Sequence, residues 1–582
     1  MNDFLQRLRE RKLVQWALAY IAAAFALLQG LDIIAQQFGW PDAVRRGITI
    51  ALALGFFVTL VLAWYHGERG AQRASGTELL ILALLLAIGG GLLWRYTRMA
   101  SPSDAVSTRH ADDAVSAPAK SVAVLPFVNM SGDPNNDYFS DGITEEILDA
   151  LAQLPHLKVA ARTSAFAFKG KAEDLRKVGE ALDVATVLEG SVQKSGDALR
   201  ITAQLIDTRS GYHLWSEKYD RKLTSIFAVE DEIAKAITER LQVQLAGENA
   251  QSLVAQKAVD PRAHDFYLRG LTLLAARAVA EAVDAFQRAV TIDPDYAQAW
   301  AALAEAQALL PAYGATAPQM AYTNSLESAR RALALNPDTA LAYVAQGMVY
   351  SDQMRWADAD RALQRALTLA PGDAEVLNQY GQFLDGIGEL EPALKVFDRA
   401  LQRDPLSGIS AAIRVQLRLL LHHYDAATAT AQMEKLLAEH PDSLFVHRAA
   451  TITYLALQRY PEAETQIRAA AMLNGADPDP KALLVRGIAD PTWRVRAVQS
   501  LETSPANADF PRDGIVHAFF LVQLRERDRA LAALEDMAVN RNSTIPQLLW
   551  NSAFDPIRDD PRFKAVLKKI GLPYLSADGP GP

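Results

Sequence analysis

The sequence of 582 residues predicts a multidomain protein: three N-terminal transmembrane helices, a small α/β domain of order βαβα-βββ-α, and an all-α solenoid. Three observations predict this fold class. Three long apolar stretches open the chain, a central segment changes between strand-like and helix-like apolar spacing, and a proline-closed motif recurs in the C-terminal half.

The overall charge and composition exclude several kinds of site. The formal net charge is −9, and a nucleic-acid-binding protein is expected to show a basic face, so we expect no nucleic acid partner. The chain contains no cysteine. This excludes disulfides, thiolate metal sites, a cysteine nucleophile and a lipid anchor on cysteine.

Residues 1–99 are predicted to form a membrane anchor. Their apolar stretches run from Leu13 to Ile34, from Gly47 to Tyr65 and from Leu79 to Trp94. A bilayer core requires roughly 20 apolar residues in a helix, which the first two stretches provide and the third approaches. A cleaved signal peptide is the alternative for the first stretch, but a clear small-x-small cleavage site is lacking and two more apolar stretches follow.

The basic residues of the short loops predict the orientation of this anchor. The strongest basic cluster precedes the first stretch, and basic loops tend to stay in the cytoplasm. Three crossings then place the C-terminal domains outside, in the periplasm of a bacterial inner membrane. Small residues at four-residue spacing (Ala22, Ala26 and Gly30) would let helices approach closely, either among the three spans or in a homo-oligomer.

A linker and a mixed α/β domain follow. Residues 100–119 are rich in Ala, Ser and Asp and predict a flexible tether, and residues 120–247 predict the domain. SVAVLPF is typical of a buried strand, YFSDGITEEILDALAQL of a helix, LKVAAR of a second strand and AEDLRKVGEAL of a second helix. Three alternating segments with turns at Gly196 and Gly211 predict a meander, which a helix from residue 227 closes.

Acidic residues near the start of the first domain helix have two interpretations. Ser140 or Asp141 can cap the helix, and Glu145 and Glu146 then suit its positive end. A magnesium or calcium site is the alternative, which we regard as the weaker because the cap accounts for every residue. For Trp215, packing in the sheet is favoured over a role in ligand binding.

Two segments of this domain resemble a known family. SVAVLPFVNMSGDPNNDYFSDGITEEI and LRITAQLIDTRSGYHLWSEKYDRKLTSIFAVEDEIA are similar to the FlgO type and to the N-terminal domain of TolB. Two further segments resemble parts of bacterial multi-pass membrane proteins with tetratricopeptide repeats: the opening LQRLRERKLVQWALAY and, near the end, FDPIRDDPRFKAVLKKIGLP. The resemblance implies envelope-associated binding or sensing and no settled catalytic activity.

A repeated pattern fills the C-terminal half. The variants AVDAFQRAVTIDP, ADRALQRALTLAP and ALKVFDRALQRDP each end at a proline. The closing prolines lie 43, 34, 34 and 36 residues apart: Pro294, Pro337, Pro371, Pro405 and Pro441. This period of about 34 residues is typical of tetratricopeptide (TPR) repeats. We expect a TPR array over residues 258–475 and degenerate helical repeats with a C-terminal cap over residues 476–582.

A stacked helical array offers a concave groove, and such grooves bind peptides. The repeat offsets predict six peptide-binding residues on the inner helices: Tyr267, Leu271, Val344, Met348, Asn378 and Gln382. The alternative is that each of them only faces solvent. The expected partners are a protein or peptide in the groove and the lipid bilayer.

The motifs of common enzymes are lacking: there is no GxxxxGKS/T loop, no GxSxG elbow, no HExxH and no EF-hand loop. We therefore expect no catalytic, cofactor or metal site. The favoured function is a membrane-anchored protein-interaction scaffold. The alternatives are a sensory component that relays an extracytoplasmic signal to a separate cytoplasmic partner and, less favoured, an unrecognised enzyme such as a hydrolase or cyclase.

Overall fold

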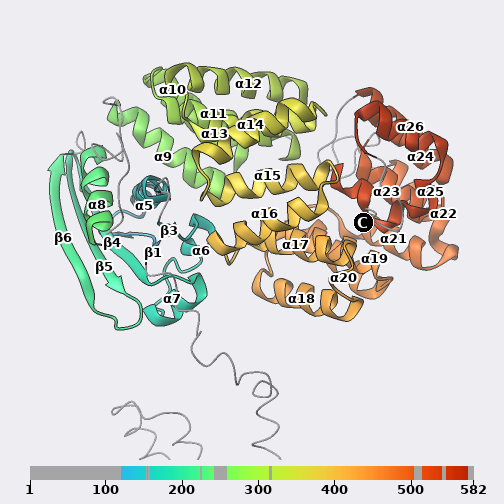
Figure 1. Cartoon of the computed structure of the whole chain (residues 1–582), viewed down its shortest axis with the longest axis horizontal. Coiled ribbons are helices and arrows are strands. Elements are labelled where there is room, and N and C mark those ends of the chain that lie inside the picture. Colours follow the sequence, from blue (N-terminus) through green and yellow to red (C-terminus); the bar gives the residue numbers. More distant parts are fainter. Residues whose placement is uncertain are drawn as a thin grey trace, which may run out of the picture. The chain divides into compact units, whose positions relative to one another are not determined.

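The computed structural model describes residues 120–152, 154, 157–222, 226–240, 259–313, 318–503, 514–540 and 546–573 (Figure 1). The three predicted membrane spans and the predicted linker lie outside these residues. Within the described ranges, no helix is both long and apolar enough to cross a bilayer. The described residues all fall in one compact unit, Val115–Pro582.

The first part of this unit is a mixed α/β domain, as predicted. Its elements are β1 (Ser121–Val124), β2 (Val128–Asn129), α5 (Asp137–Ala152), β3 (Lys158–Val159), α6 (Arg162–Phe166), α7 (Leu175–Leu182), β4 (Thr186–Ser195), β5 (Ala198–Asp207), β6 (His213–Lys222) and α8 (Ile226–Arg240). The predicted order of strands and helices is present, with the short β2 and α6 added.

The sheet has the order β3-β1-β4-β5-β6. β1 pairs in parallel with β3 and β4, whereas β4, β5 and β6 form an antiparallel meander. Helices α5 and α8 cover one face of the sheet and α7 the other. All four residues of β1 are buried, as expected for a strand covered on both faces. Trp215 is 8% exposed and packs in the sheet core, opposite Leu205.

The predicted cap of α5 is wrong. α5 begins at Asp137, directly after a 3-10 turn over Pro134–Asn136, and Asp133 caps that turn by accepting a hydrogen bond from the Asn135 amide. Because the turn continues into the helix, the cap moves upstream and Ser140 and Asp141 lie inside the helix. Glu145 and Glu146 therefore lie in its middle, where they contact other elements and not the helix end.

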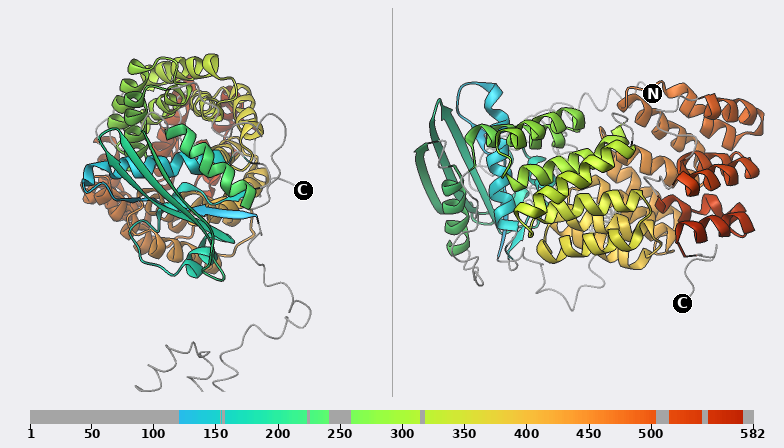
Figure 2. Two further views of the ribbon diagram at one scale, coloured as in Figure 1. Left: turned by 90° about the vertical axis from the view of Figure 1, so that its left-hand side faces the viewer. Right: turned by 90° about the horizontal axis from the view of Figure 1, so that it is seen from above.

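The second part of the unit is an all-α TPR array. Its paired helices are α9 (Pro261–Ala275) with α10 (Val279–Ile292), α11 (Ala297–Leu309) with α12 (Pro318–Leu335), α13 (Ala340–Asp352) with α14 (Trp356–Leu369), α15 (Ala374–Gly386) with α16 (Leu390–Arg403), α17 (Gly408–Leu420) with α18 (Ala426–Glu439), and α19 (Leu444–Ala456) with α20 (Tyr460–Leu473). Each pair packs closely, and the pairs follow a curved path (Figure 2).

Helical pairing continues past the clear repeats. The further elements are α21 (Pro478–Ala489), α22 (Arg494–Thr503), α23 (Ile515–Gln523), α24 (Arg527–Asn540), the 3-10 turns η6 (Pro546–Trp550) and η7 (Ser552–Phe554), α25 (Asp555–Arg558) and α26 (Pro561–Ile570). They share one hydrophobic core with α14–α20. α26 also contacts α14, where the Trp356 indole donates a hydrogen bond of 2.6 Å to the carbonyl of Ile570.

The repeated glycines pack against the repeated large residues. A Cβ atom on Gly270 would lie 2.4 Å from the Phe286 ring, and one on Gly347 would lie 2.4 Å from Cγ of Leu363. No side chain fits at such a distance, so glycine lets the two helices of a repeat touch. The repeat period therefore reflects a steric requirement.

The first helices of successive repeats lie on the concave side. α11 packs on α13, α13 on α15, and α17 on α19. Contacts between the first helices of neighbouring repeats are expected on the inner side of a curved stack, where repeats lie closest together. The concave surface is therefore formed by α9, α11, α13, α15, α17 and α19.

Candidate functional site: the concave surface of the helical array

The α/β domain covers the first repeat of the concave surface. Tyr267 and Leu271 on α9 are 5% and 8% exposed and pack in the core that includes α5. The contact is close, because a Cβ atom on Gly142 of α5 would lie 2.6 Å from the Leu268 side chain. These two predicted peptide-binding residues thus contact the protein's own domain.

The other four predicted residues differ in accessibility. Val344 is fully buried among α13, α14 and α15, and Met348 is partly buried. The Asn378 side chain is 9% exposed and its Oδ1 accepts a hydrogen bond of 3.2 Å from Ser410 of the next repeat. Gln382 is partly buried. Peptide binding at these residues stays a prediction, and Met348 and Gln382 are the two that keep accessible side chains.

The C-terminal segment 546–558 covers a later part of the concave surface. The Trp550 indole nitrogen donates a hydrogen bond of 2.8 Å to the main-chain carbonyl of Asp385 at the end of α15. A Cβ atom on Gly386 would lie 2.9 Å from Pro546, so the segment lies directly on the helix. The chain's own residues therefore fill the array at two places.

Arg558 holds this segment in its conformation. Its side chain is 3% exposed and donates hydrogen bonds to the carbonyls of Leu549 (3.3 Å), Trp550 (3.3 Å) and Asn551 (3.0 Å). Its Nε also lies 2.8 Å from Oδ1 of Asp555. A buried guanidinium with acceptors for its donors stabilises a loop, whereas an unpaired one would be costly.

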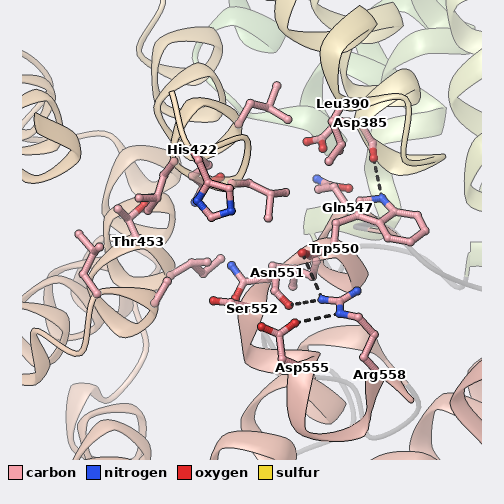
Figure 3. A pocket seen from close by; sticks show the side chains of 18 residues that line it. Asp385, Leu390, His422, Thr453, Gln547, Trp550, Asn551, Ser552, Asp555 and Arg558 are labelled. Carbon is pink, nitrogen blue, oxygen red and sulfur yellow. Dashed lines mark hydrogen bonds and ion pairs between the residues drawn. The ribbon is translucent and has the colours of Figure 1, made fainter. Parts of the chain in front are cut away.

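A cavity of about 280 Å³ lies between segment 546–558 and helices α15, α17 and α19 (Figure 3). Apolar side chains form much of its wall: Leu390, Leu417, Leu419, Leu420, Ile452, Leu457 and Leu548. Polar side chains complete the lining: Asp385, Gln416, His422, Thr453, Gln547, Asn551, Ser552, Asp555 and Arg558. Burial raises the pKa of Asp385 to about 7.

Carboxylates line the concave surface between the two covered parts. Burial, and then the charge of Glu375, raises the pKa of Glu305 on α11 to about 8. Enclosure by protein also raises the pKa of Glu375 and raises that of Asp149 on α5 well above its usual value. Asp149 and Glu375 are solvent-accessible, so water limits these two shifts. The pKa of Asp149 also responds to Asp373, which indicates that these acids face a common space.

Two arginines partly balance these acids. Nε of Arg162 lies 2.7 Å from Oε2 of Glu145, and the charge of Arg277 lowers the pKa of Glu305 and of Glu375. Carboxyl groups thus outnumber the cations named here, and this part of the concave surface becomes negative as they ionise with rising pH. Ionised carboxylates attract basic segments of a partner.

Hydrogen bonds fix the α/β domain to the fourth repeat. The Ser164 hydroxyl donates to Oδ1 of Asp404 (2.5 Å), and the Leu406 amide donates to the Ser164 oxygen (2.9 Å). The Ala161 amide donates to the carbonyl of Arg403 (2.8 Å). Helices α5 and α6 therefore hold the domain on the array (Figure 1).

A buried polar cluster lies where α5, α8 and α9 meet. Glu230 on α8 is fully buried, and among the residues that the structure describes neither of its carboxyl oxygens has a hydrogen-bond partner. Burial raises its pKa well above the usual value, and burial raises that of Glu146 to about 7. Nδ1 of His264 lies 3.0 Å from the Tyr296 hydroxyl. Within the described part of the chain, no group of three or more His, Asp or Glu side chains could hold a metal.

Sequence reasoning missed Asp385, Glu305 and Asp149 as residues of the concave surface, whereas Glu375 falls at an inner repeat position. One signal was present: Glu375, Gln382 and Asp385 recur at spacings that place them on one face of α15. The covering by α5 and by segment 546–558 had no such signal, since it joins segments far apart in the chain.

Comparison with known proteins gives partial matches. No family model matches the chain. A Rhizobium meliloti (strain 1021) protein named "Putative adenylate cyclase 3" is 46% identical over 190 residues, which are 32% of each chain. Anaphase-promoting complex subunit 3 of Schizosaccharomyces pombe (strain 972 / ATCC 24843) is 28% identical over 168 residues, 29% of this chain and 24% of that protein. The chain thus spans about a third or less of these curated relatives.

Solved structures of helical repeat proteins resemble parts of the chain. A tetratricopeptide repeat protein from Parabacteroides merdae ATCC 43184 is 14% identical, covers 46% of this chain and 100% of its own, and has a TM-score of 0.32. YrrB, described as a TPR protein with an unusual peptide-binding site, is 18% identical, covers 32% of this chain and 89% of its own, and has a TM-score of 0.23. At these TM-scores neither structure indicates what this chain binds.

Proposed function

We propose that this protein is a membrane-anchored scaffold whose TPR groove and α/β domain bind envelope proteins or peptides. The observation that carries the proposal is the concave surface between α5 and segment 546–558, where Glu305, Glu375 and Gln382 keep accessible side chains. An array fixed to a second domain presents a continuous rigid surface, and binding to such a surface loses little conformational freedom.

Affinity capture with charge-reversed variants tests this proposal. The full chain carrying Glu305→Arg and Glu375→Arg is compared with wild type and with a control carrying Glu327→Arg and Glu391→Arg on the second helices α12 and α16. We expect wild type and control to capture the same partner and the concave variant to lose it. Capture of identical proteins by all three chains would contradict the proposal.

The location of the protein and its orientation in the membrane belong to the same proposal. The three N-terminal apolar stretches and the basic cluster before the first support a cytoplasmic N-terminus, a bacterial inner membrane and periplasmic C-terminal domains. A reporter fused after Pro582 tests this placement. We expect activity from a reporter that works only in the periplasm, and activity from one that works only in the cytoplasm would reverse the placement.

A second candidate is a regulatory component that relays an extracytoplasmic signal to a separate cytoplasmic partner. One observation favours it: the 190 residues shared with the Rhizobium meliloti relative, whose name refers to a cyclase. Deletion of the loop Arg69–Arg73 should then change a second-messenger level in cells. An unchanged cyclic AMP level would argue against relay, and we expect the purified chain itself to form no cyclic AMP from ATP.

A further inference from the structure

The cavity beside Asp385 has the form of a subsite within the concave surface. Its volume of about 280 Å³ is close to the lower end of the range for ligand pockets, about 300–1,000 Å³. It is open to solvent, because His422, Ser552 and Asp555 in its lining are exposed. Such a space suits one side chain of a bound segment better than a large ligand.

Asp385 supplies a nearly buried carboxyl group to the wall of this cavity. The residue is 7% exposed, and among the described residues no hydrogen bond or ion pair reaches its carboxyl group. Trp550 contacts the main-chain carbonyl of Asp385 and not the carboxylate. A buried carboxylate without a partner is costly, so a donor that enters the cavity would gain a strong hydrogen bond.

The other charged groups of the cavity do not supply this donor. Arg558 is committed to three carbonyl groups and to Asp555. His422 also lines the cavity, but it is an exposed residue just after the end of α17, and within the described residues no hydrogen bond or ion pair joins it to Asp385. Because Arg558 is already occupied, the cavity does not attract an anion, and the free Asp385 carboxylate favours a cation.

We propose that this cavity binds the cationic side chain of a lysine or arginine in the partner segment, with Asp385 as its counter-ion. Leu417, Leu420 and Ile452 in the cavity wall would contact the aliphatic part of that side chain. This inference rests on the proposed function, because the segment would reach the cavity along the concave surface.

The position of Asp385 on α15 supports this path. Glu375, Gln382 and Asp385 lie on one face of the helix, because Gln382 follows Glu375 by about two turns and Asp385 follows Gln382 by about one. A basic segment on the acidic part of the concave surface would pass Glu375 and Gln382 before it reaches Asp385. The carboxylates of this surface, once ionised, would attract the segment, and the cavity would select a particular residue.

Ligand-detected NMR on the full chain tests the inference with small probes. The probes are n-butylammonium and n-butylguanidinium, which mimic the two side chains, with n-butanol and n-pentanoate as neutral and anionic controls. We expect saturation transfer to the two cations to be at least five times stronger than to the controls. Equal transfer to n-butanol would show that the apolar wall alone binds, and stronger transfer to n-pentanoate would reverse the assigned charge; either result overturns the inference.

Substitutions and the pH dependence of probe affinity test whether the cationic probes bind at Asp385. Asp385→Asn should abolish the preference for cations, whereas Asp352→Asn should keep it, because the Asp352 carboxylate already accepts a hydrogen bond of 2.7 Å from Tyr322. Since Asp385 binds a cation when ionised and its pKa is about 7, affinity should fall about tenfold from pH 8 to pH 6. His422→Gln should leave this pH dependence unchanged. A preference that persists in Asp385→Asn would overturn the inference.

Failure here is distinguishable from failure of the proposed function. If the cationic probes do not bind, but the Glu305→Arg and Glu375→Arg variant still loses its captured partner, the scaffold function holds and the subsite is wrong. If the probes bind Asp385 but all chains capture the same proteins, the cavity is a small-molecule site and the inference about a partner segment fails.

Discussion

The indole nitrogen of Trp550 lies 2.8 Å from the main-chain oxygen of Asp385, which is 165 residues earlier in the chain. The last carbonyls of a helix have no partner within it, and Asp385 is the penultimate residue of α15. Trp550 satisfies this carbonyl and, with Pro546 against Gly386, holds the C-terminal segment on the concave surface. The contact also forms one side of the cavity that exposes the Asp385 carboxylate.

Trp550→Phe removes this hydrogen bond and keeps an aromatic ring in the core. We expect a loss of about 1 kcal/mol of unfolding free energy, with faster hydrogen exchange in residues 546–558. Trp300→Phe is the control, because the Trp300 indole donates its hydrogen bond of 2.9 Å to the main-chain carbonyl of Pro294. That bond joins two nearby residues and does not involve segment 546–558. Exchange in 546–558 that is equally fast in both variants would contradict the role of Trp550.

Gly347→Ala places a methyl group where Leu363 already lies. A Cβ atom there would be 2.4 Å from Cγ of Leu363, so the two helices of the repeat must separate. We expect a loss of about 1–3 kcal/mol, the usual cost of overpacking, seen as a lower midpoint of thermal unfolding. Gly372→Ala is the matched control, since the atom closest to a Cβ there would be Cζ of Arg403 at 3.5 Å, an ordinary contact distance. A control as destabilised as Gly347→Ala would contradict this account.

The turns within the repeats adopt a left-handed backbone, with Gly388 (φ 86°) and Gln458 (φ 56°) at equivalent places. A side chain is disfavoured in this conformation by about 1–2 kcal/mol. Gly388→Ala should therefore destabilise the chain by about 1 kcal/mol, and Gln458→Gly should stabilise it by less than about 1 kcal/mol because glycine loses more entropy on folding. Unfolding midpoints measure both, and changes of the same sign would disprove the explanation.

The buried carboxyl groups predict that stability falls as pH rises. Glu146 and Glu230 have raised pKa values in the folded protein, so the folded state binds more protons than the unfolded chain. The fall begins above the unfolded pKa of 4.5 and continues through about 7 for Glu146, and through the raised pKa of Glu230. Glu230→Gln should remove the part of this fall that comes from Glu230, so the unfolding midpoint should depend less steeply on pH. An unchanged slope of the unfolding midpoint between pH 5 and pH 9 would contradict the role of Glu230.

Local spacing predicted the parts of the fold that depend on neighbouring residues. Gly347 and Leu363 lie in one repeat, so their contact appears in the sequence as a recurring pair, and the period of the prolines predicts the helix pairs. The alternation in β5 similarly predicts which face of the meander is buried, as Ile201 and Leu205 confirm.

The functional surface depended on contacts that no local spacing records. Tyr267 occupies an inner position of its repeat, yet α5 covers it, because residues near 142 and 268 meet only in the folded chain. The contact of Asp385 with Trp550 is of the same kind. The cap of α5 was misplaced because a preceding 3-10 turn starts the helix earlier than the apolar spacing suggests.

Site-specific photocrosslinking in cells tests most directly whether the concave surface binds a partner. A photoreactive residue replaces Gln382 on α15 and, as a control, Lys395, which is exposed on α16 of the same repeat. The scaffold account predicts one discrete crosslinked partner from position 382, none from position 395, and loss of that product with Glu305→Arg and Glu375→Arg. Equal products from both positions, or none from position 382 while the captured partner is bound, would contradict it.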